Sequence, residues 1–250
     1  MPLVHKDMNR FLVLSLLALF CAVNNFSCIS KSEISRSQIR QAERVIAEQG
    51  GGKNHVTIQT SLGKIVVVLY DDTPAHRDNF LQQVQAGTYT GVLFHRVIKD
   101  FMIQAGDPTS KFALATARYG GTSAGEDVPP EIRRTLFHHK GALAAARAGD
   151  DVNPGKYSSG SQFYIVVGSV QSDSTLQTVM QQKGITIPED QQMVYRTVGG
   201  TPHLDGEYTV FGRIIRGQRV LDKIAARPTD FTDRPRRDIY IRSMTVKVRK

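Results

Sequence analysis

The chain has 250 residues, 40% of them hydrophobic and 22% charged, which supplies one sizeable core and excludes a broadly disordered protein. Both cysteines lie within the first 28 residues, so the other 222 (250 minus 28) can form neither a disulfide nor a cysteine–metal centre. The seven histidines lack the spacing of a metal site, and we expect no metal and no cofactor. The net charge of +9 is spread along the chain, and we expect no nucleic-acid partner.

The first 28 residues have the pattern of an export signal. Lys6 and Arg10 precede an apolar run over residues 11–23, which is too short for a membrane-spanning helix and typical of a secretory signal. We therefore expect an exported protein, in the periplasm or held as a lipoprotein in a bacterial envelope. The sequence Asn25-Phe26-Ser27-Cys28 resembles a relaxed lipobox, so lipidation of Cys28 with membrane attachment and ordinary cleavage nearby are both open.

Residues 29–53 predict a spacer. Apolar residues recur at loosely helical spacing over residues 31–49, and three glycines, residues 50–52, follow as a flexible joint. The folded domain is expected to occupy residues 54–250.

The domain is predicted to be mainly β. Short β-branched and aromatic runs separated by turn residues indicate eight strands, at residues 55–60, 64–70, 92–98, 101–104, 142–146, 162–167, 208–215 and 238–248. This density of short strands favours a closed eight-stranded antiparallel barrel, which has no open edge. The last strand carries the densest basic stretch, residues 234–250, read as the solvated side of an edge strand.

Two helices are expected to cap the ends of the barrel. Thr73 is a predicted N-cap before Pro74, and Gly87 ends that helix. The second helix is predicted over residues 219–226. A polar stretch at about 168–200 predicts a helical insertion, with one helix near residues 176–182 and a second opened by a capping box at residues 186–189.

Two sequence blocks embed strong hydrogen-bonding groups among apolar neighbours. They are FHRVI with FMIQAGD, over residues 94–107, and SGSQFY, over residues 159–164. A desolvated arginine needs a partner or a purpose, and periodicity alone favours Arg96 paired with a carboxylate at the barrel surface. Asp107 is expected to tie down a loop, and Asp205-Gly206 to form a hairpin turn.

Together with residues 140–149 and 203–212, these blocks resemble the cyclophilin family of peptidyl-prolyl cis/trans isomerases, over about residues 54–248. The resemblance implies an eight-stranded antiparallel barrel capped by two helices, in agreement with the strand count. It implies that Arg96 is catalytic, together with Gln104 and Phe101. The substrate-binding residues that it implies are Met102, Ala146, Arg147, Gln162, Tyr164, His203, Leu204 and Tyr208.

Four of these positions depart from the commonest family pattern. His203, Tyr208, Tyr164 and Arg147 stand where tryptophan, histidine, phenylalanine and asparagine are frequent. The three ring changes alter the polarity of the rim, and Arg147 is expected to add charge there. Peptide preference and cyclosporin affinity need not follow the family.

The expected chemistry is rotation about the bond that precedes proline. Its barrier comes from donation of the nitrogen lone pair into the carbonyl, and a guanidinium stabilises the twisted state in which that lone pair sits on nitrogen. The partners are therefore proline-containing polypeptides, and the protein is expected to be monomeric. A chaperone-like module that binds proline segments with incidental turnover is the alternative, and a structural lipoprotein with the barrel as ballast is a weaker third.

Overall fold

A computed structural model describes residues 34–114 and 117–249. The chain divides into two compact units, Met1–Ser35 and Arg36–Lys250, and the elements given below belong to the second. The expected signal segment, with Cys28, lies outside the described residues. Within the described ranges, no helix combines the length and the apolar character needed to cross a bilayer.

The described part of the second unit contains eight strands, five α-helices and two short 3₁₀ turns. In chain order they are α2 (Arg36–Ala47), β1 (Asn54–Thr60), β2 (Gly63–Leu69), α3 (Pro74–Gln85), β3 (Phe94–Ile98), β4 (Met102–Ala105), η1 (Pro108–Phe112), β5 (Ala142–Ala145), β6 (Phe163–Val166), α4 (Asp173–Lys183), α5 (Glu189–Thr197), η2 (Pro202–Leu204), β7 (Val210–Arg216), α6 (Gln218–Ala225) and β8 (Ile241–Val248). Each expected strand is present, with bounds that differ by up to three residues.

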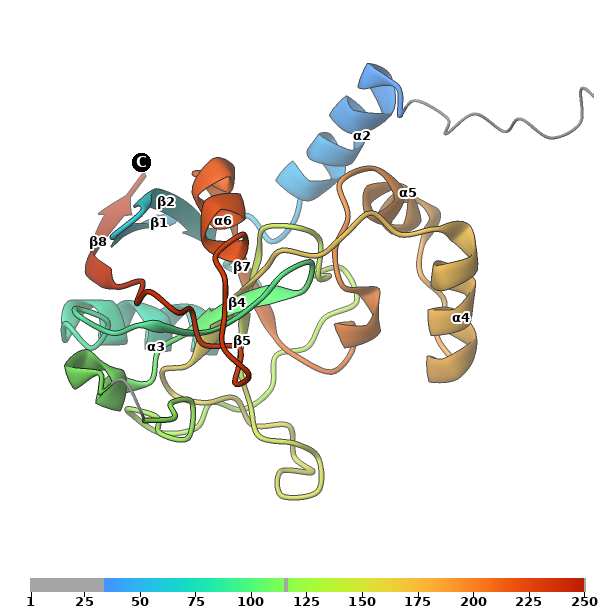
Figure 1. Cartoon of the computed structure of the whole chain (residues 1–250). Coiled ribbons are helices and arrows are strands. Elements are labelled where there is room, and N and C mark those ends of the chain that lie inside the picture. The colour runs from blue at the N-terminus through green and yellow to red at the C-terminus, as the bar shows by residue number, and fades with distance from the viewer. Residues whose placement is uncertain (1–33, 115–116, 250) are drawn as a thin grey trace, which may run out of the picture. The chain divides into compact units, whose positions relative to one another are not determined.

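The eight strands form one antiparallel sheet in the order β3-β4-β6-β5-β7-β2-β1-β8. The sheet curls until the regions beside its two edge strands meet (Figure 1). Leu93 forms an isolated antiparallel bridge with Tyr240, and the Phe94 amide donates to the Ile239 carbonyl over 2.9 Å. The predicted strand at residues 92–98 therefore begins with this bridge and joins the ladder only at Phe94.

The main hydrophobic core lies inside the curl of the sheet. Strand residues of one parity point inward, as Ile65, Val67 and Leu69 do on β2. Helix α3 adds Phe80 to the same core, and α6 adds Leu221. The expectation of an antiparallel eight-stranded β fold with two capping helices is therefore confirmed.

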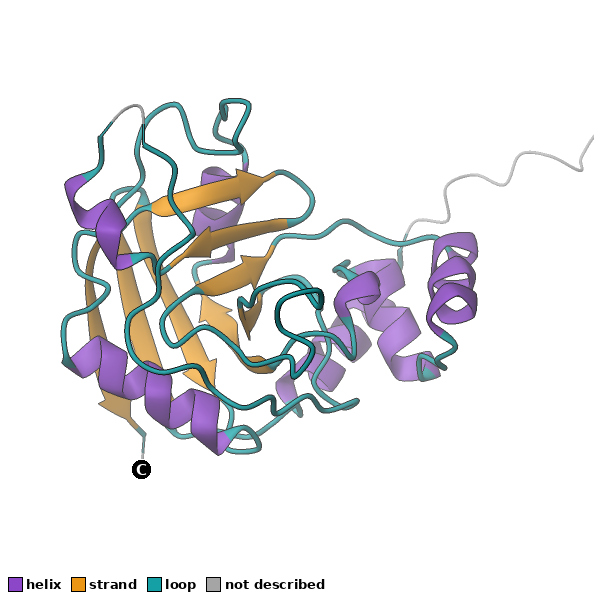
Figure 2. Cartoon of the chain, turned by 90° about the horizontal axis from the view of Figure 1, so that it is seen from below, coloured by secondary structure: helices purple, strands orange, loops and turns teal. Residues whose placement is uncertain are grey.

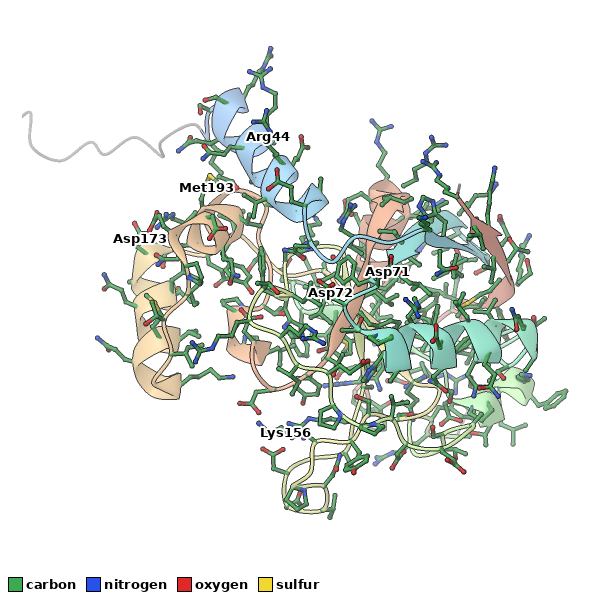
Figure 3. All side chains as sticks on the ribbon, turned by 180° about the vertical axis from the view of Figure 1, so that it is seen from behind. Arg44, Asp71, Asp72, Lys156, Asp173 and Met193 are labelled. Atoms are coloured by element: carbon green, nitrogen blue, oxygen red, sulfur yellow. The ribbon has the colours of Figure 1, made fainter. Side chains whose placement is uncertain are left out.

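A second helical layer lies beside the sheet, formed by α4 and α5 of the expected insertion together with α2. Figure 2 shows these helices gathered at one side of the strands. Ala42 of α2 is fully buried against Leu176 of α4 and Val194 of α5. Met193 of α5 packs against the same cluster and lies close to α2 in Figure 3.

The insertion leaves and rejoins the sheet at one narrow point. Ser169 pairs with Gly200 in an isolated bridge, and His139 pairs with Gly200 as well. A Cβ on Gly168, at a φ of +54°, would lie 2.4 Å from the Gly200 Cα. A Cβ on Gly200, at a φ of +153°, would lie 2.3 Å from the His138 carbonyl oxygen. Both positions therefore need glycine, because a side chain at Gly168 would collide with Gly200 and a side chain at Gly200 would collide with the backbone at His138.

Of two predicted helix caps, one is in place without its hydrogen bond and the other is wrong. Thr73 is the N-cap residue of α3, as predicted, but its side chain makes no capping bond, and the Ala75 and His76 amides donate instead to Glu131 over 3.1 and 2.9 Å. A glutamate from a distant loop thus supplies the negative charge that a helix start favours. The capping box at residues 186–189 does not form either, because α5 begins at Glu189 after Pro188.

Two further local expectations need correction. Arg242 and Lys247 are exposed on β8 as expected, but Arg234 is buried and donates to both carboxylate oxygens of Asp238 over 2.9 and 3.0 Å. Asp205-Gly206 is no hairpin turn, because it follows η2 in a loop. The Asp205 carboxylate accepts hydrogen bonds from three groups in that loop's surroundings, described below.

Candidate active site

The sheet register brings the expected site residues together in one row. Arg96 on β3 pairs with Gln104 on β4, Gln104 pairs with Tyr164 on β6, and Tyr164 pairs with Ala144 on β5. Because side chains alternate along a strand, these four point to the same face of the sheet. Their strand neighbours Ile103 and Ile165 point to the opposite face, into the main core.

A cavity of about 170 Å³ lies on this face. Nine of the eleven expected residues line it: Arg96, Phe101, Met102, Gln104, Ala146, Arg147, Tyr164, Leu204 and Tyr208. The two others lie beside it. Gln162 lines an adjoining cavity of about 470 Å³ that shares Gln104, Ala146 and Arg147 with the first, and the His203 ring stacks on Phe101 with their centroids 5.7 Å apart.

The Arg96 guanidinium lies at the mouth of the smaller cavity. Its side chain is 44% exposed, and its Nε lies 3.5 Å from Asp233 Oδ2. The loop that carries Asp233 is held beside β3, because the Val97 amide donates to the Asp233 carbonyl over 2.8 Å. An exposed pair of this kind contributes about 1 kcal/mol or less, so the charge of Arg96 stays available to a ligand. Asp233 is thus the surface carboxylate that periodicity alone favoured as a partner of Arg96, although the sequence did not indicate which carboxylate it would be.

Gln104 and Gln162 hold the wall between the two cavities. The Gln104 amide donates to Gln162 Oε1 over 2.9 Å, and the Gln162 amide donates to the carbonyls of Gly120 and Thr122 over 3.0 and 2.9 Å. Asp107 secures the same loop, because its carboxylate accepts from the Gly120 amide over 2.6 Å. Asp107 ties down a loop, as expected.

Arg147 does not add free charge to the rim, contrary to expectation. Its side chain is 4% exposed, and its charge meets Asp150 at 2.5 Å and Glu207 at 3.6 Å. Its guanidinium carbon lies 4.7 Å from the centre of the Tyr208 ring, which fixes that ring by a cation–π contact. At this position, where asparagine is frequent in the family, the chain therefore has a buried arginine whose charge is neutralised and which supports the Tyr208 ring.

His95, next to Arg96, is neutral at physiological pH. Burial lowers its pKa to about 4, and neither ring nitrogen has a hydrogen-bond partner among the described residues. The same residues contain no cluster of histidine, cysteine and carboxylate groups that could hold a metal ion. Arg96 is thus the charge that faces the cavity beside this strand.

The arrangement suits rotation of a bond more than cleavage of one. Within the described residues, the smaller cavity is lined by two arginines, one glutamine and apolar or aromatic groups, without serine, cysteine, histidine or carboxylate. Apart from the hydroxyls of Tyr164 and Tyr208, it offers no side chain that commonly serves as a nucleophile or a general base. It offers a small space of mixed polar and apolar lining, with the permanent cation of Arg96 at its mouth.

The sequence profile of the "Cyclophilin type peptidyl-prolyl cis-trans isomerase/CLD" family matches residues 55–246. A putative peptidyl-prolyl cis-trans isomerase of Staphylococcus saprophyticus is 36% identical over 200 residues, which cover 80% of this chain and 94% of that protein. A putative bifunctional phosphatase/peptidyl-prolyl cis-trans isomerase of Streptococcus pyogenes is 37% identical over 194 residues. That match covers 76% of this chain but only 38% of the relative.

Solved structures agree with the sequence comparison. A crystal structure of a Cryptosporidium parvum cyclophilin-type isomerase matches 79% of this chain and 99% of its own, with a TM-score of 0.58 and 26% identity. A second crystal structure of that protein, in the presence of the dipeptide Ala-Pro, has a TM-score of 0.57, 26% identity, and covers 78% of this chain and 99% of its own. With a family match across most of its length and the curled eight-stranded sheet of that fold, the chain belongs to the cyclophilin-type family of peptidyl-prolyl cis-trans isomerases.

Proposed function

We propose that Arg96 carries the isomerase activity of this chain by stabilising the twisted peptide bond before proline. The observation that supports this most directly is the row of Arg96, Gln104 and Tyr164 across adjacent strands, with the cation at the mouth of a small cavity that Phe101, Met102 and Leu204 also line. The cavity would take the proline ring. The adjoining cavity, lined by Gln162, would take residues that precede the proline.

The reaction itself needs no bond-breaking group. A barrier of about 18–20 kcal/mol opposes rotation because the amide nitrogen shares its lone pair with the carbonyl. As the bond twists, that lone pair returns to the nitrogen, which becomes a hydrogen-bond acceptor. A guanidinium that donates to this nitrogen binds the twisted state more strongly than either planar isomer, and only such differential binding raises the rate.

Burial by the substrate decides whether this effect is large enough. The prolyl nitrogen carries only a partial charge, so two unit charges give an upper limit: about 4 Å apart they interact by about 1 kcal/mol in water and about 4 kcal/mol at an effective dielectric constant of 20. A hundredfold to thousandfold acceleration requires about 2.7–4 kcal/mol, which water-exposed Arg96 could not supply. Phe101, Met102 and Leu204 therefore matter because, with the proline ring, they would exclude water from the guanidinium.

We also propose that the enzyme acts on exported chains as they fold. The support is the basic start and apolar run of residues 6–23, which has the pattern of a secretory signal. Slow proline isomerisation, over tens to hundreds of seconds, delays folding wherever a chain must reach one isomer. A peptidyl-prolyl isomerase in that compartment would remove the delay.

Replacing Arg96 tests the mechanism. In a protease-coupled assay on an Ala-Pro peptide, Arg96→Ala is expected to lower kcat/KM about a hundredfold to a thousandfold, the cost of removing one preorganised electrostatic group. Arg236→Ala is the matched control, because Arg236 is exposed and its hydrogen bond goes to the Thr229 carbonyl outside both cavities. Near wild-type turnover of Arg96→Ala, with the control unchanged, would exclude the mechanism.

The same variant separates catalysis from simple binding. If Arg96→Ala loses turnover but still suppresses aggregation of a proline-rich client as well as the wild-type protein does, the chaperone-like function is the main one. If both properties fall together, isomerisation is the main function.

A further inference from the structure

Two residues of the proline cavity depend on a loop with little regular structure of its own. Leu204 and Tyr208 line the cavity, and the segment that carries them, residues 202–208, contains only the 3₁₀ turn η2. Such a segment keeps one conformation only where contacts from outside hold it. In this chain some of those contacts come from Arg147, Lys156 and His138, and others come from the helical insertion.

Lys183, the last residue of α4, fixes the backbone on both sides of Leu204. Its Nζ donates to the His203 carbonyl over 2.9 Å and to the Asp205 carbonyl over 2.8 Å. It also lies 3.3 Å from Glu207 Oε1. The lysine therefore bridges three points of one short loop, and Leu204 stands between two of them.

Tyr195 of α5 begins a second connection, which reaches the cavity wall. Its hydroxyl donates to Asp205 Oδ2 over 2.6 Å, while Asp205 Oδ1 accepts from the His138 backbone amide and from Nδ1 of its ring over 2.9 and 2.8 Å. The other ring nitrogen, Nε2, lies within hydrogen-bond distance of the Tyr164 hydroxyl, at 2.9 Å, and accepts from it when the proton on Nδ1 faces the carboxylate. Tyr164 lines the cavity.

This connection is sheltered from water along its length. Tyr195 is 0% exposed, His138 1% and Tyr164 5%, and the Asp205 side chain is 14% exposed. Burial raises the pKa of both tyrosines well above its usual value, so each hydroxyl keeps the proton that it donates. Loss of the Tyr195 hydroxyl would therefore leave Asp205 Oδ2 without this partner, at one end of a connection whose other end is Tyr164.

We propose that the insertion holds the proline cavity in its binding shape through Lys183 and Tyr195, which are positioning residues that act on Leu204, Tyr208 and Tyr164. This inference rests on the proposed assignment of the cavity to proline. It gives the insertion a function in substrate affinity: without the two contacts, the loop would spend part of its time in conformations that do not bind substrate. Arg96, on β3, would keep its own position.

The prediction is a change in KM without a comparable change in kcat. If the binding-competent fraction of the loop falls to about a tenth, the apparent affinity falls about tenfold, while bound substrate still reacts at its normal rate. We expect that result for Tyr195→Phe and for Lys183→Met in the full chain, with kcat within about twofold of wild type. Lys183→Arg keeps a cationic donor and is expected to restore most of the affinity.

Each variant has a matched control. Tyr70→Phe removes another buried hydroxyl bond, from Tyr70 to Gln49 Oε1 over 3.1 Å, and Tyr70 lines neither cavity. Lys156→Met removes the other lysine on Glu207, bonded to Oε2 over 2.6 Å, whose backbone lies in the connection between β5 and β6 and not in the insertion (Figure 3). KM is measured at 10 °C on samples whose near-UV circular dichroism matches that of wild type.

The outcomes separate this inference from the proposed mechanism. A wild-type KM in both Tyr195→Phe and Lys183→Met, or an equal rise of KM in the two controls, overturns the role of the insertion and leaves Arg96 untouched. If Arg96→Ala instead keeps its kcat, the proposed mechanism fails, and the KM of the two insertion variants still decides whether they hold the cavity.

Discussion

Asp107 is the best place to measure what one buried carboxylate contributes to the site. Its Oδ1 accepts from the amide and the hydroxyl of Thr109 over 2.8 and 2.6 Å. Its Oδ2 accepts from the amides of Gly120 and Thr122 over 2.6 and 3.3 Å. Asparagine can keep one oxygen, so Asp107→Asn must turn an NH₂ group toward donors.

The cost follows from the bonds lost. A hydrogen bond to a charged group contributes about 1.5–3 kcal/mol. In Asp107→Asn, the two donors that bind one carboxylate oxygen would face the new NH₂ group instead, and we expect the loss of their bonds to destabilise the fold by about 3 kcal/mol. For a domain of this size that corresponds to a fall in Tm of about 6–12 °C. Differential scanning calorimetry at pH 7 measures it directly.

The pH dependence has a definite sign. Burial pushes the pKa of Asp107 up, but hydrogen bonds from Thr109, Gly120 and Thr122 outweigh it and hold the pKa below its usual value. The ionised carboxylate therefore contributes its full stabilisation above the unfolded pKa of about 3.9, and this is lost as the pH falls through the lower folded value. The Tm difference between wild type and Asp107→Asn should be constant from pH 7 to pH 5 and shrink below pH 4.

Asp230 supplies the control. It forms the same kind of turn at the surface, but its three donors, from Thr232 and Arg234, all meet Oδ1, which asparagine retains. Asp230→Asn should therefore leave Tm nearly unchanged. A Tm for Asp107→Asn within about 1 °C of wild type at pH 7 would refute the reasoning.

Two other predictions concern Cys28 in the expected signal segment and Glu131 at the start of α3. Cys28→Ala should move the protein from the membrane fraction to the soluble fraction if Cys28 is lipidated, and an unchanged membrane fraction would exclude the anchor. Glu131→Ala should lower the free energy of unfolding by about 2–3 kcal/mol, because Glu131 accepts from two amides at the start of α3 and from the His76 ring over 2.7 Å. Thr73→Ala, which removes no capping bond, should change it little by comparison in urea titrations.

Local pattern was enough to predict the strands and the two capping helices. Strand positions follow from short β-branched and aromatic runs bounded by turn residues, such as residues 64–70, which form β2. Pro74 and Gly87 bound α3 by their own backbone preferences. These signals lie within a few residues of the structure that they specify.

The unpredicted features depend on residues far apart in the chain. Thr73 had the right chemistry for a cap, but Glu131 competes for the same amides and carries a full charge. Arg147 was predicted to add charge to the rim because Glu207 and Tyr208, about 60 residues away in the chain, become its neighbours only after folding. Lys183 and Tyr195 were not predicted to have a role, because nothing near them in the sequence indicates that they contact the loop at residues 202–208.

The parity of the strands has a consequence for how such a protein can change. On β4 and β6 the residues that line the cavity alternate with residues that fill the core, so neighbouring positions answer to different selective demands. Gln104 is only partly buried, so substitutions there can alter peptide preference without opening a void in the core, whereas Ile103 and Ile165 can be exchanged only for groups of similar volume. Tyr164 faces the cavity as well, but it is 5% exposed and bonded to His138, so it is restricted in volume and polarity too. A library for new specificity should therefore randomise the codon of Gln104 and leave those of its buried neighbours fixed.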